Sequence, residues 1–438
     1  MTELLHHRDA YIEAFAGFVG DAPSSYHAAS AVAEVLSRAG FEPHDEAEEW
    51  APVAAGSRGV VVRDGAVIAW RAGGDAAASL GPATPVRILG AHTDSPGFVL
   101  KPQPSFAAEG WQQAGVEVYG GPMLNSWLDR DLGFAGRIVT GDGSEHLVRT
   151  GAVARIPQLA IHLDREVNAG LTLDRQRHTQ PVLGVTVAVP DPVRSLLADA
   201  VRAEGHSIRE DDIAGTDVRL FDTQPPARIG FAGELFASPR LDNLSSVFAG
   251  LAALLETEPA PGTIAMLAAF DHEELGSSSR SGAAGPFLED VVSRIAAGLG
   301  AGVEDRARAL AASWCLSADA GHAVHPNYPE KHDPRVRPRP GGGAMLKINA
   351  NQRYASDAHG AGLWRRCCEA AGVPTQEFVS SNDTPCGSTI GPITATRLGI
   401  RTVDVGVPLL SMHSARELAH VDDLHGLGRA TASFFAGA

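Results

Sequence analysis

The chain opens with apolar residues at helical spacing and continues with short apolar runs of strand length. Two helices are predicted before Gly40, the second of them starting after Pro23-Ser24-Ser25. Strands are predicted at 59–62, 66–71 and 86–91. The apolar face of the first helix consists of Tyr11, Ile12, Phe15, Phe18 and Val19.

Glycine and proline become frequent from about residue 97 to about residue 233. Short alternating segments at 115–119 and 182–189 predict a mostly β module there. Helical spacing then returns, and the later predicted elements are a helix after Asp242, a buried strand at 263–270, a helical stretch at 287–310, a strand at 312–317, a helix at 359–371, a last strand at 400–405 and a closing helix. The predicted fold class is α/β, with a domain built around a central mixed sheet (1–96 and 234–438) that is interrupted by a β-rich domain (97–233).

Histidines and carboxylates follow the predicted apolar strands. His92, the pair Glu273-Glu274, Asp319 and His413 each come after a strand, and Asp242 comes just before a helix. In an open α/β sheet the ligand crevice lies outside the carboxyl ends of the strands, so these side chains are expected to converge. Two histidines and three carboxylates suit two borderline metals such as zinc, cobalt or manganese, with one carboxylate shared.

Each of these residues also has an ordinary structural interpretation. Glu273 and Glu274 could form a solvated acidic turn, and Asp242 could be a helix N-cap. His92 and Asp94 could be core polar residues satisfied by the backbone, or a metal ligand and the carboxylate that orients it. The side chains of Glu273 and Glu274 diverge, so that one can hold a metal while the other faces water or substrate. That division of labour is typical of metal-assisted hydrolysis.

Composition excludes several classes of function. A chain of 438 residues with 44% hydrophobic and 20% charged residues is an ordinary globular protein, long enough for two domains. The net charge of −16 argues against nucleic-acid binding, and no apolar run has the length of a membrane span. The four cysteines include no Cys-x-x-Cys pair, and the first residues lack the order of a signal peptide. A cytoplasmic location is expected.

The chain resembles the aspartyl aminopeptidases, the M18 family of dinuclear metallo-aminopeptidases. The matching motifs run in family order along nearly the whole chain. They are Ala91-His-Thr-Asp-Ser-Pro96, Trp127-Leu-Asp-Arg-Asp-Leu132, Leu159-Ala-Ile-His-Leu-Asp-Arg165, Ser238-Pro-Arg-Leu-Asp-Asn-Leu244, Phe270-Asp-His-Glu-Glu-Leu-Gly-Ser277, Asp319-Ala-Gly-His-Ala-Val-His-Pro-Asn327, Asn349-Ala-Asn-Gln-Arg-Tyr354, Ser381-Asn-Asp-Thr-Pro-Cys-Gly-Ser-Thr-Ile-Gly391 and Ser411-Met-His-Ser414.

The resemblance implies that the inserted β-rich domain is a dimerisation domain and that twelve subunits form a tetrahedral assembly. It also implies two divalent metal ions per subunit, zinc first and cobalt or manganese as alternatives. One ion would be held by His92, Asp242 and Asp319. The other would be held by Asp242, Glu274 and His413, with Asp242 bridging the two. Glu273 would be the general base, and Asp94 would orient His92.

The expected substrates are peptides with an N-terminal Asp or Glu. The resemblance places His322, Lys347, Tyr354 and Met412 at the substrate pocket, where Lys347 would hold the acidic side chain. It places His162 in the active site of a neighbouring subunit, where it would stabilise an oxyanion. The structural alternatives are a surface lysine for Lys347 and a sheet-surface histidine for His162.

Two other functions compete with this prediction. The first keeps the two metals but changes the substrate, giving a neutral aminopeptidase or an N-acyl amino acid deacylase. The second is a non-catalytic cage or adaptor that has kept the fold, although the presence of every base and ligand type argues against it.

Overall fold

The computed structural model describes residues 3–74, 80–185 and 189–438. Its largest sheet has nine strands in the order β1-β2-β3-β13-β4-β14-β18-β16-β17. The central strands β13, β4, β14 and β18 are parallel, while β3 and β16 run antiparallel to their inner neighbours. The mixed sheet confirms the predicted α/β class. Its strands are β1 (Glu42–Pro43), β2 (Arg58–Arg63), β3 (Ala66–Ala72), β4 (Val86–His92), β13 (Ile264–Phe270), β14 (Trp314–Ala318), β16 (Ala344–Lys347), β17 (Thr375–Phe378) and β18 (Arg401–Gly406).

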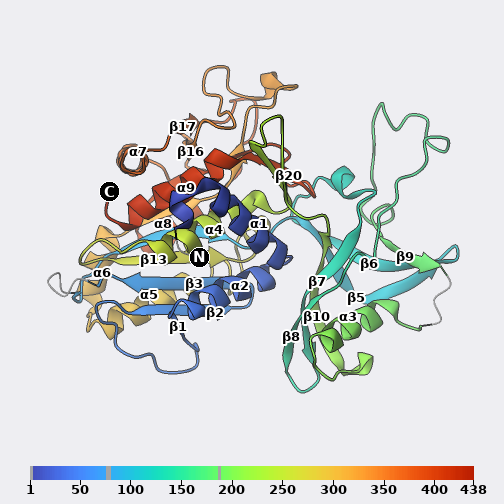
Figure 1. Ribbon diagram of the computed structural model, residues 1–438, viewed down its shortest axis with the longest axis horizontal. Helices are drawn as coiled ribbons and strands as arrows, with labels where there is room; N and C mark the ends of the chain where they lie inside the picture. The colour runs from blue at the N-terminus through green and yellow to red at the C-terminus, as the bar shows by residue number, and fades with distance from the viewer. Residues whose placement is uncertain (1–2, 75–79, 186–188) are drawn as a thin grey trace.

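Helices cover both faces of this sheet (Figure 1). One face packs against α1 (Arg8–Asp21), α2 (Ser25–Arg38), α4 (Leu241–Glu256), α7 (Ala358–Ala371) and α9 (Val421–Phe435). The other face packs against α5 (Phe287–Gly298), α6 (Val303–Ala312) and α8 (Ile390–Leu398). Strand β13 is buried on both faces along its whole length, which explains why its sequence is a continuous apolar run.

A second sheet, to the right of the first in Figure 1, has six antiparallel strands in the order β8-β7-β10-β5-β6-β9. These strands are β5 (Gly97–Ala108), β6 (Trp111–Tyr119), β7 (Leu132–Thr140), β8 (Glu145–Arg149), β9 (Val182–Val185) and β10 (Ile213–Asp222). We call it the inserted sheet. Helix α3 (Pro192–Ala203) packs on it and was not predicted. Residues 186–188 of the predicted alternating segment 182–189 lie outside the described residues.

Two short sheets complete the fold. One joins β11 (Ala227–Ile229), β12 (Leu235–Ser238) and β20 (Glu417–His420), and the other joins β15 (Gly321–His322) to β19 (Pro408–Leu409). The prediction that 400–405 is the last strand is therefore wrong, since β19 and β20 follow it. The helical stretch predicted at 287–310 is interrupted after Gly298, where α5 ends. The domain boundaries at 96 and 233 stay predictions.

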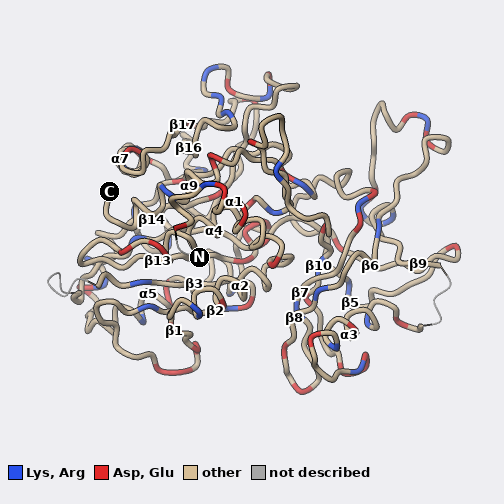
Figure 2. The backbone as a smooth tube through the Cα atoms, viewed as in Figure 1, with Lys and Arg blue, Asp and Glu red and all other residues tan. Residues whose placement is uncertain are grey.

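The charged residues are spread over both sheets, with Asp and Glu interspersed among Lys and Arg (Figure 2). In the part of the chain that the structure describes, no helix is both long and apolar enough to cross a membrane.

Candidate active site

Three neighbouring parallel strands deliver the first candidate ligands to one edge of the nine-stranded sheet. His92 is the last residue of β4, and Asp319 directly follows β14, which pairs with β4. Glu273 and Glu274 lie in a 3-10 turn, Glu273–Leu275, just after β13 on the other side of β4. These side chains therefore meet at the carboxyl ends of the strands, where the sequence placed them.

Asp242 lies between the two histidines. Its Oδ1 is 3.3 Å from His92 Nε2, and its Oδ2 is 3.3 Å from His413 Nε2. Glu274 Oε1 approaches the same His413 nitrogen at 3.4 Å, and Asp319 Oδ1 approaches the His92 nitrogen at 3.7 Å. The two oxygens of one carboxylate thus face two separate sets of ligand atoms, which is the arrangement of a bridging ligand.

The unsatisfied polar atoms of this cluster fit bound cations. Asp242 Oδ1 and Glu274 Oε1 are buried and have no hydrogen-bond partner among the described residues. Buried acceptors are normally satisfied, so atoms of this kind indicate a missing partner. Three groups of side chains in the described part of the chain have ligand atoms within 4.8 Å of one another, and all three lie here: His92-Asp242-Asp319, His92-Glu273-Glu274 and Asp242-Glu274-His413.

Electrostatics also favour cations at this site. Burial alone would lower the pKa of both histidines, but the adjacent carboxylates raise the pKa of His92 well above its ordinary value and that of His413 to about 10. Burial raises the pKa of Glu274 well above normal and that of Glu273 to about 7. Burial would also raise the pKa of Asp242, but its contacts with the histidines outweigh that effect and lower it. The cluster stabilises positive charge on its imidazoles, and two divalent ions would supply such charge.

Asp94 orients two parts of the site, the Glu273–Glu274 turn and the His92 ring. Its Oδ1 accepts a hydrogen bond from the Glu273 backbone N–H at 3.0 Å, and its Oδ2 accepts one from the Glu274 N–H at 3.2 Å. His92 Nδ1 donates to the Asp94 carbonyl at 3.0 Å, which leaves Nε2 free for a metal. Left-handed residues bracket the turn, with φ of 61° at His272 and 88° at Gly276. Asp94 therefore sets the directions of both glutamates.

The end of the inserted sheet contributes to the same site. The carbonyl of Gly121 accepts a hydrogen bond from His413 Nδ1 at 3.1 Å, which directs Nε2 toward Asp242. Gly120 has a φ of +65°, and a Cβ there would lie 3.2 Å from the Glu274 Cβ, so the chain needs glycine for this close approach. Tyr119 donates its hydroxyl to Asp94 Oδ2 at 2.7 Å. No pattern in the sequence predicted these contacts.

Glu417 is a further residue of the site that no sequence pattern predicted. It is 2% exposed on β20, and its carboxylate accepts the backbone N–H of Asp242 at 2.9 Å and that of His413 at 2.8 Å. Asn243 follows Asp242 and donates to the carbonyl of Ala318 at 2.7 Å. Asp242 does not cap the helix, because the N-cap position of α4 is Arg240 and both oxygens of the Asp242 carboxylate face the histidines. No side-chain pattern marks a lone glutamate such as Glu417 in advance.

A cavity of about 420 Å³ opens beside the cluster. Its lining includes Glu273 together with the predicted substrate residues His322, Lys347, Tyr354 and Met412. Lys347 is 2% exposed and therefore not a surface lysine. Its Nζ donates to the carbonyl of Ala320 at 2.6 Å and lies 3.6 Å from Asp319 Oδ2. Burial, and then the nearby Lys347 charge, lower the pKa of His322, so its imidazole is neutral near neutral pH.

His162 lies apart from these residues. It is exposed on the segment that follows β8, outside the lining of the cavity. Neighbouring residues of this segment expose large apolar side chains, with Leu159 60% and Leu163 75% exposed. The predicted role of His162 requires another subunit and stays a prediction.

The fold has a mixed sheet covered by helices, and at one end of its strands the Asp242 carboxylate lies between two histidines. Glu273 lies beside them in the lining of a cavity. These features together are typical of a metal-dependent hydrolase. The chain belongs to the M18 family of zinc metallo-aminopeptidases. The family model described as "Aminopeptidase I zinc metalloprotease (M18)" matches residues 18–435. This finding confirms the family suggested by the sequence motifs.

Relatives match the chain over nearly its whole length. A "Probable M18 family aminopeptidase 2" of Streptomyces avermitilis is 50% identical over 427 residues, covering 96% of each chain. One of Stutzerimonas stutzeri is 43% identical, covering 98% of this chain and 99% of its own.

Solved structures share the fold. The chain from "Cryo-EM structure of the Ape4 and Nbr1 complex" has a TM-score of 0.93 at 34% identity, covering 98% of this chain and 86% of its own. The chain from "Structure of S. cerevesiae mApe1 dodecamer" has a TM-score of 0.81 at 28% identity, covering 97% and 96%.

Proposed function

We propose that this aminopeptidase removes N-terminal Asp and Glu residues from peptides, with two divalent ions bound per subunit. The observation that carries the proposal is the buried Asp242, whose two oxygens face different histidines at one end of a cavity that also contains Lys347. The ligand set would be His92, Asp242 and Asp319 for one ion and Asp242, Glu274 and His413 for the other. Zinc is the expected metal, with cobalt or manganese as alternatives.

Bound divalent ions would act as Lewis acids and lower the pKa of water. Glu273 is the remaining carboxylate at the cavity, and we assign it the proton transfers. It would accept a proton from the attacking water as the new C–O bond forms at the peptide carbonyl. It would then give that proton to the amine nitrogen as the C–N bond breaks.

Lys347 supports the acidic specificity. An ammonium has three donors, and here one reaches the carbonyl of Ala320 while another faces Asp319. The third is left for a ligand. A substrate carboxylate at this depth would form a charge-assisted hydrogen bond shielded from water. Tyr354, whose ring lies 5.3 Å from Nζ, would hold the lysine in place.

The test compares Lys347→Met with Lys331→Met on Glu-, Asp-, Leu- and Ala-anilides. Lys331 lines the same cavity but is exposed, so it is the matched control. We expect Lys347→Met to lower the ratio of kcat/KM for Glu over Leu by about 10- to 100-fold, the value of a hydrogen bond to a charged group. Lys331→Met should leave that ratio nearly unchanged.

A Glu-to-Leu ratio that Lys347→Met leaves unchanged would rule out this role for Lys347. A parent enzyme that prefers neutral or N-acylated substrates would establish the alternative function, a neutral aminopeptidase or deacylase. A parent without bound metal or hydrolysis across the whole panel would favour the non-catalytic cage.

The proposal includes self-association. We expect a dodecamer built from dimers, in which the inserted sheet forms the dimer contact and His162 reaches a neighbouring active site. One similar structure, mApe1 of S. cerevisiae, is described as a dodecamer. The exposed apolar side chains around His162 support a contact there. A cytoplasmic location stays an expectation.

A further inference from the structure

Arg219 of the inserted sheet lies behind the candidate active site. It belongs to β10, a strand paired on both sides, with Arg219 opposite Val99 of β5 and Ala135 of β7. Its guanidinium carbon lies 3.8 Å from the centre of the Tyr119 ring. A cation stacked this closely on an aromatic face is held by the ring quadrupole. A central strand of the inserted sheet thus places a fixed charge against Tyr119 at the end of β6, a strand of the same sheet.

Tyr119 connects this charge to the acidic turn. Its hydroxyl donates to Asp94 Oδ2 at 2.7 Å, and Asp94 in turn accepts the N–H groups of Glu273 and Glu274. Every step in this path is a contact between buried or half-buried groups, where electrostatic interactions are stronger than in water. The path runs Arg219, Tyr119, Asp94 and then the backbone of the two glutamates.

The cost of burying Arg219 argues for a role beyond packing. Its Nη1 is buried and has no hydrogen-bond partner among the described residues. A buried charge with incomplete partners is weak evidence for stability, and an apolar side chain of similar size is often as good or better there. The charge of Arg219 acts on two buried carboxylates, Asp94 and Asp271, and on the Tyr119 hydroxyl.

We infer that Arg219 is a positioning residue for the Glu273–Glu274 turn, acting through Tyr119 and Asp94. Its charge strengthens the hydrogen bond from Tyr119 to Asp94, and it holds Asp94 in the orientation that accepts both backbone N–H groups. The inserted sheet is then part of the catalytic apparatus of its own subunit, in addition to any contact it makes with other subunits. This inference rests on the proposed role of Glu273.

The test uses Arg219→Met and Tyr119→Phe in the zinc-loaded full-length enzyme. Loss of a residue that supports metal ligands typically costs about 10- to 100-fold in activity or metal affinity. We expect kcat for the favoured anilide to fall about tenfold in each variant, with KM within about twofold of the parent, because the substrate pocket is untouched. The double variant should lose no more than the larger single loss, since both residues act along one path.

Arg137→Met is the matched control. Arg137 is also an arginine of the inserted sheet, stacked on a tyrosine at 4.6 Å (Tyr26) and bonded across to Asp64 at 3.1 Å, but its hydrogen-bonding partners among the described residues are Asp64, Glu145 and Asp217 and include no residue of the acidic turn. The Arg137→Met variant should have a lower thermal stability than the parent and an unchanged kcat. Arg219→Lys, which keeps the charge, should recover part of the kcat that Arg219→Met loses.

Zinc affinity, measured by competition with a chromophoric chelator, gives a readout separate from catalysis. It should fall in Arg219→Met and Tyr119→Phe and stay unchanged in Arg137→Met. The inference is overturned if kcat and zinc affinity of Arg219→Met match those of the parent, or if Arg137→Met loses as much kcat and zinc affinity as Arg219→Met does. It is also overturned if the losses of kcat in Arg219→Met and Tyr119→Phe add up in the double variant. A parent that hydrolyses no aminoacyl substrate would refute the proposed function, and zinc affinity would then decide on Arg219. If Arg219→Met does not fold, Tyr119→Phe and Arg219→Lys carry the same comparison.

Discussion

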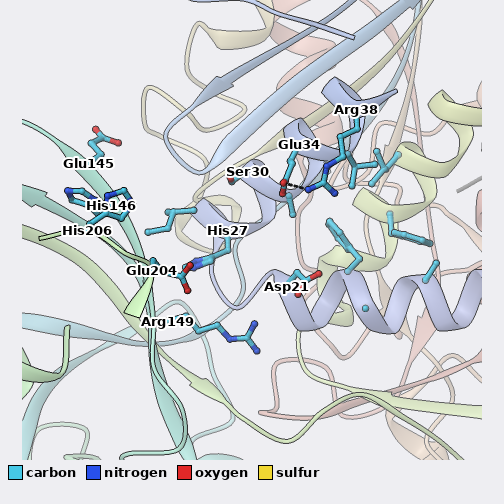
Figure 3. Close-up of a pocket in the computed structure, with 18 residues that line it drawn as sticks. Asp21, His27, Ser30, Glu34, Arg38, Glu145, His146, Arg149, Glu204 and His206 are labelled. Carbon is cyan, nitrogen blue, oxygen red and sulfur yellow. Dashed lines mark hydrogen bonds and ion pairs between the residues drawn. The ribbon is translucent and has the colours of Figure 1, made fainter. Parts of the chain in front are cut away.

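Among the cavities formed by the described residues, two that are lined by histidines and carboxylates differ in size, and the larger of these two is not the candidate active site. We call the larger one the groove. It has a volume of about 880 Å³ and lies between the α1–α2 pair and the edge strand β8 of the inserted sheet, together with residues that follow α3 (Figure 3). Its polar lining includes His27, His146, His206, Glu145 and Glu204. The cavity beside Asp242 has about half that volume.

The difference lies in how the side chains meet. In the groove the rings of His146 and His206 lie side by side, 4.9 Å apart, but Glu145 and Glu204 are exposed and join no ligand group. At the site, buried and half-buried carboxylates from two strand ends and one helix start converge on two imidazole nitrogens. Residue type and volume therefore do not locate the chemistry. The site is instead identified by ligand atoms that lie close together and include buried acceptors without hydrogen-bond partners.

The largest expected difference between the cavities concerns Glu273. Replacing Glu273 with Gln keeps the shape but removes the proton acceptor, so kcat should fall by about 10²–10⁴-fold, the usual contribution of general acid–base catalysis. The matched groove variant is Glu204→Gln, an exposed glutamate, which should leave kcat unchanged. The measurement is hydrolysis of Glu-anilide at saturating zinc, with zinc content checked in both proteins.

Equal rates for the parent and Glu273→Gln would contradict the assignment of the base. A large loss of kcat in Glu204→Gln would instead show that the groove takes part in catalysis, and the contrast between the two cavities would no longer hold.

Zinc binding gives the next test. His413→Ala removes one ligand of the proposed second ion, so zinc per subunit should fall from two toward one after dialysis against a weak chelator. His206→Ala, the groove counterpart, should bind as much zinc as the parent. Elemental analysis by mass spectrometry measures both. Retention of two ions by His413→Ala would show that His413 is not a ligand, and a parent with one ion would refute the dinuclear proposal.

The sequence predicted the site better where ligands end apolar strands. His92 ends one apolar strand and Glu274 follows another, and the apolar composition of both strands predicts that they are buried. The two strands are neighbours in the sheet, which brings His92 and Glu274 together. Asp242 could not be separated from an N-cap by sequence alone, because both interpretations need a carboxylate at a helix start. The contacts with His92 and His413 decide between them.

The positioning residues were invisible in the sequence for a different reason. Glu417 contacts the backbone of a residue 175 positions away, and Tyr119 contacts Asp94 from another sheet. Such contacts depend on tertiary placement of groups that have no pattern of their own. Helix α3 was missed because its short apolar face lies in a region rich in strands, glycine and proline. The role of His162 depends on a second copy of the chain.

The smallest effect we predict is a change in stability with pH that arises in the groove. His27 lies in α2, where Ser24 Oγ is 2.8 Å from its Nδ1. Burial, together with the charges of Arg149 and Arg240, lowers its pKa to about 4 from an ordinary 6.5. The unfolded chain therefore takes up a proton at this histidine at higher pH than the folded protein does. The contribution of His27 to the free energy of unfolding is therefore fully present above about pH 6.5 and is lost as the pH falls toward 4.

Between pH 7 and pH 5 the loss should be about 2 kcal/mol, because one pKa unit corresponds to about 1.4 kcal/mol and only part of the shift is sampled. His27→Asn keeps a polar group near Ser24 but does not titrate in this range, so its thermal midpoint should fall less than that of the parent on acidification. His206→Asn, at an exposed groove position, should follow the parent. If parent and His27→Asn respond equally to pH, His27 is hydrated in solution. The groove would then be an open surface down to α2, which would further separate it from the site around Asp242, where buried and half-buried ligands converge.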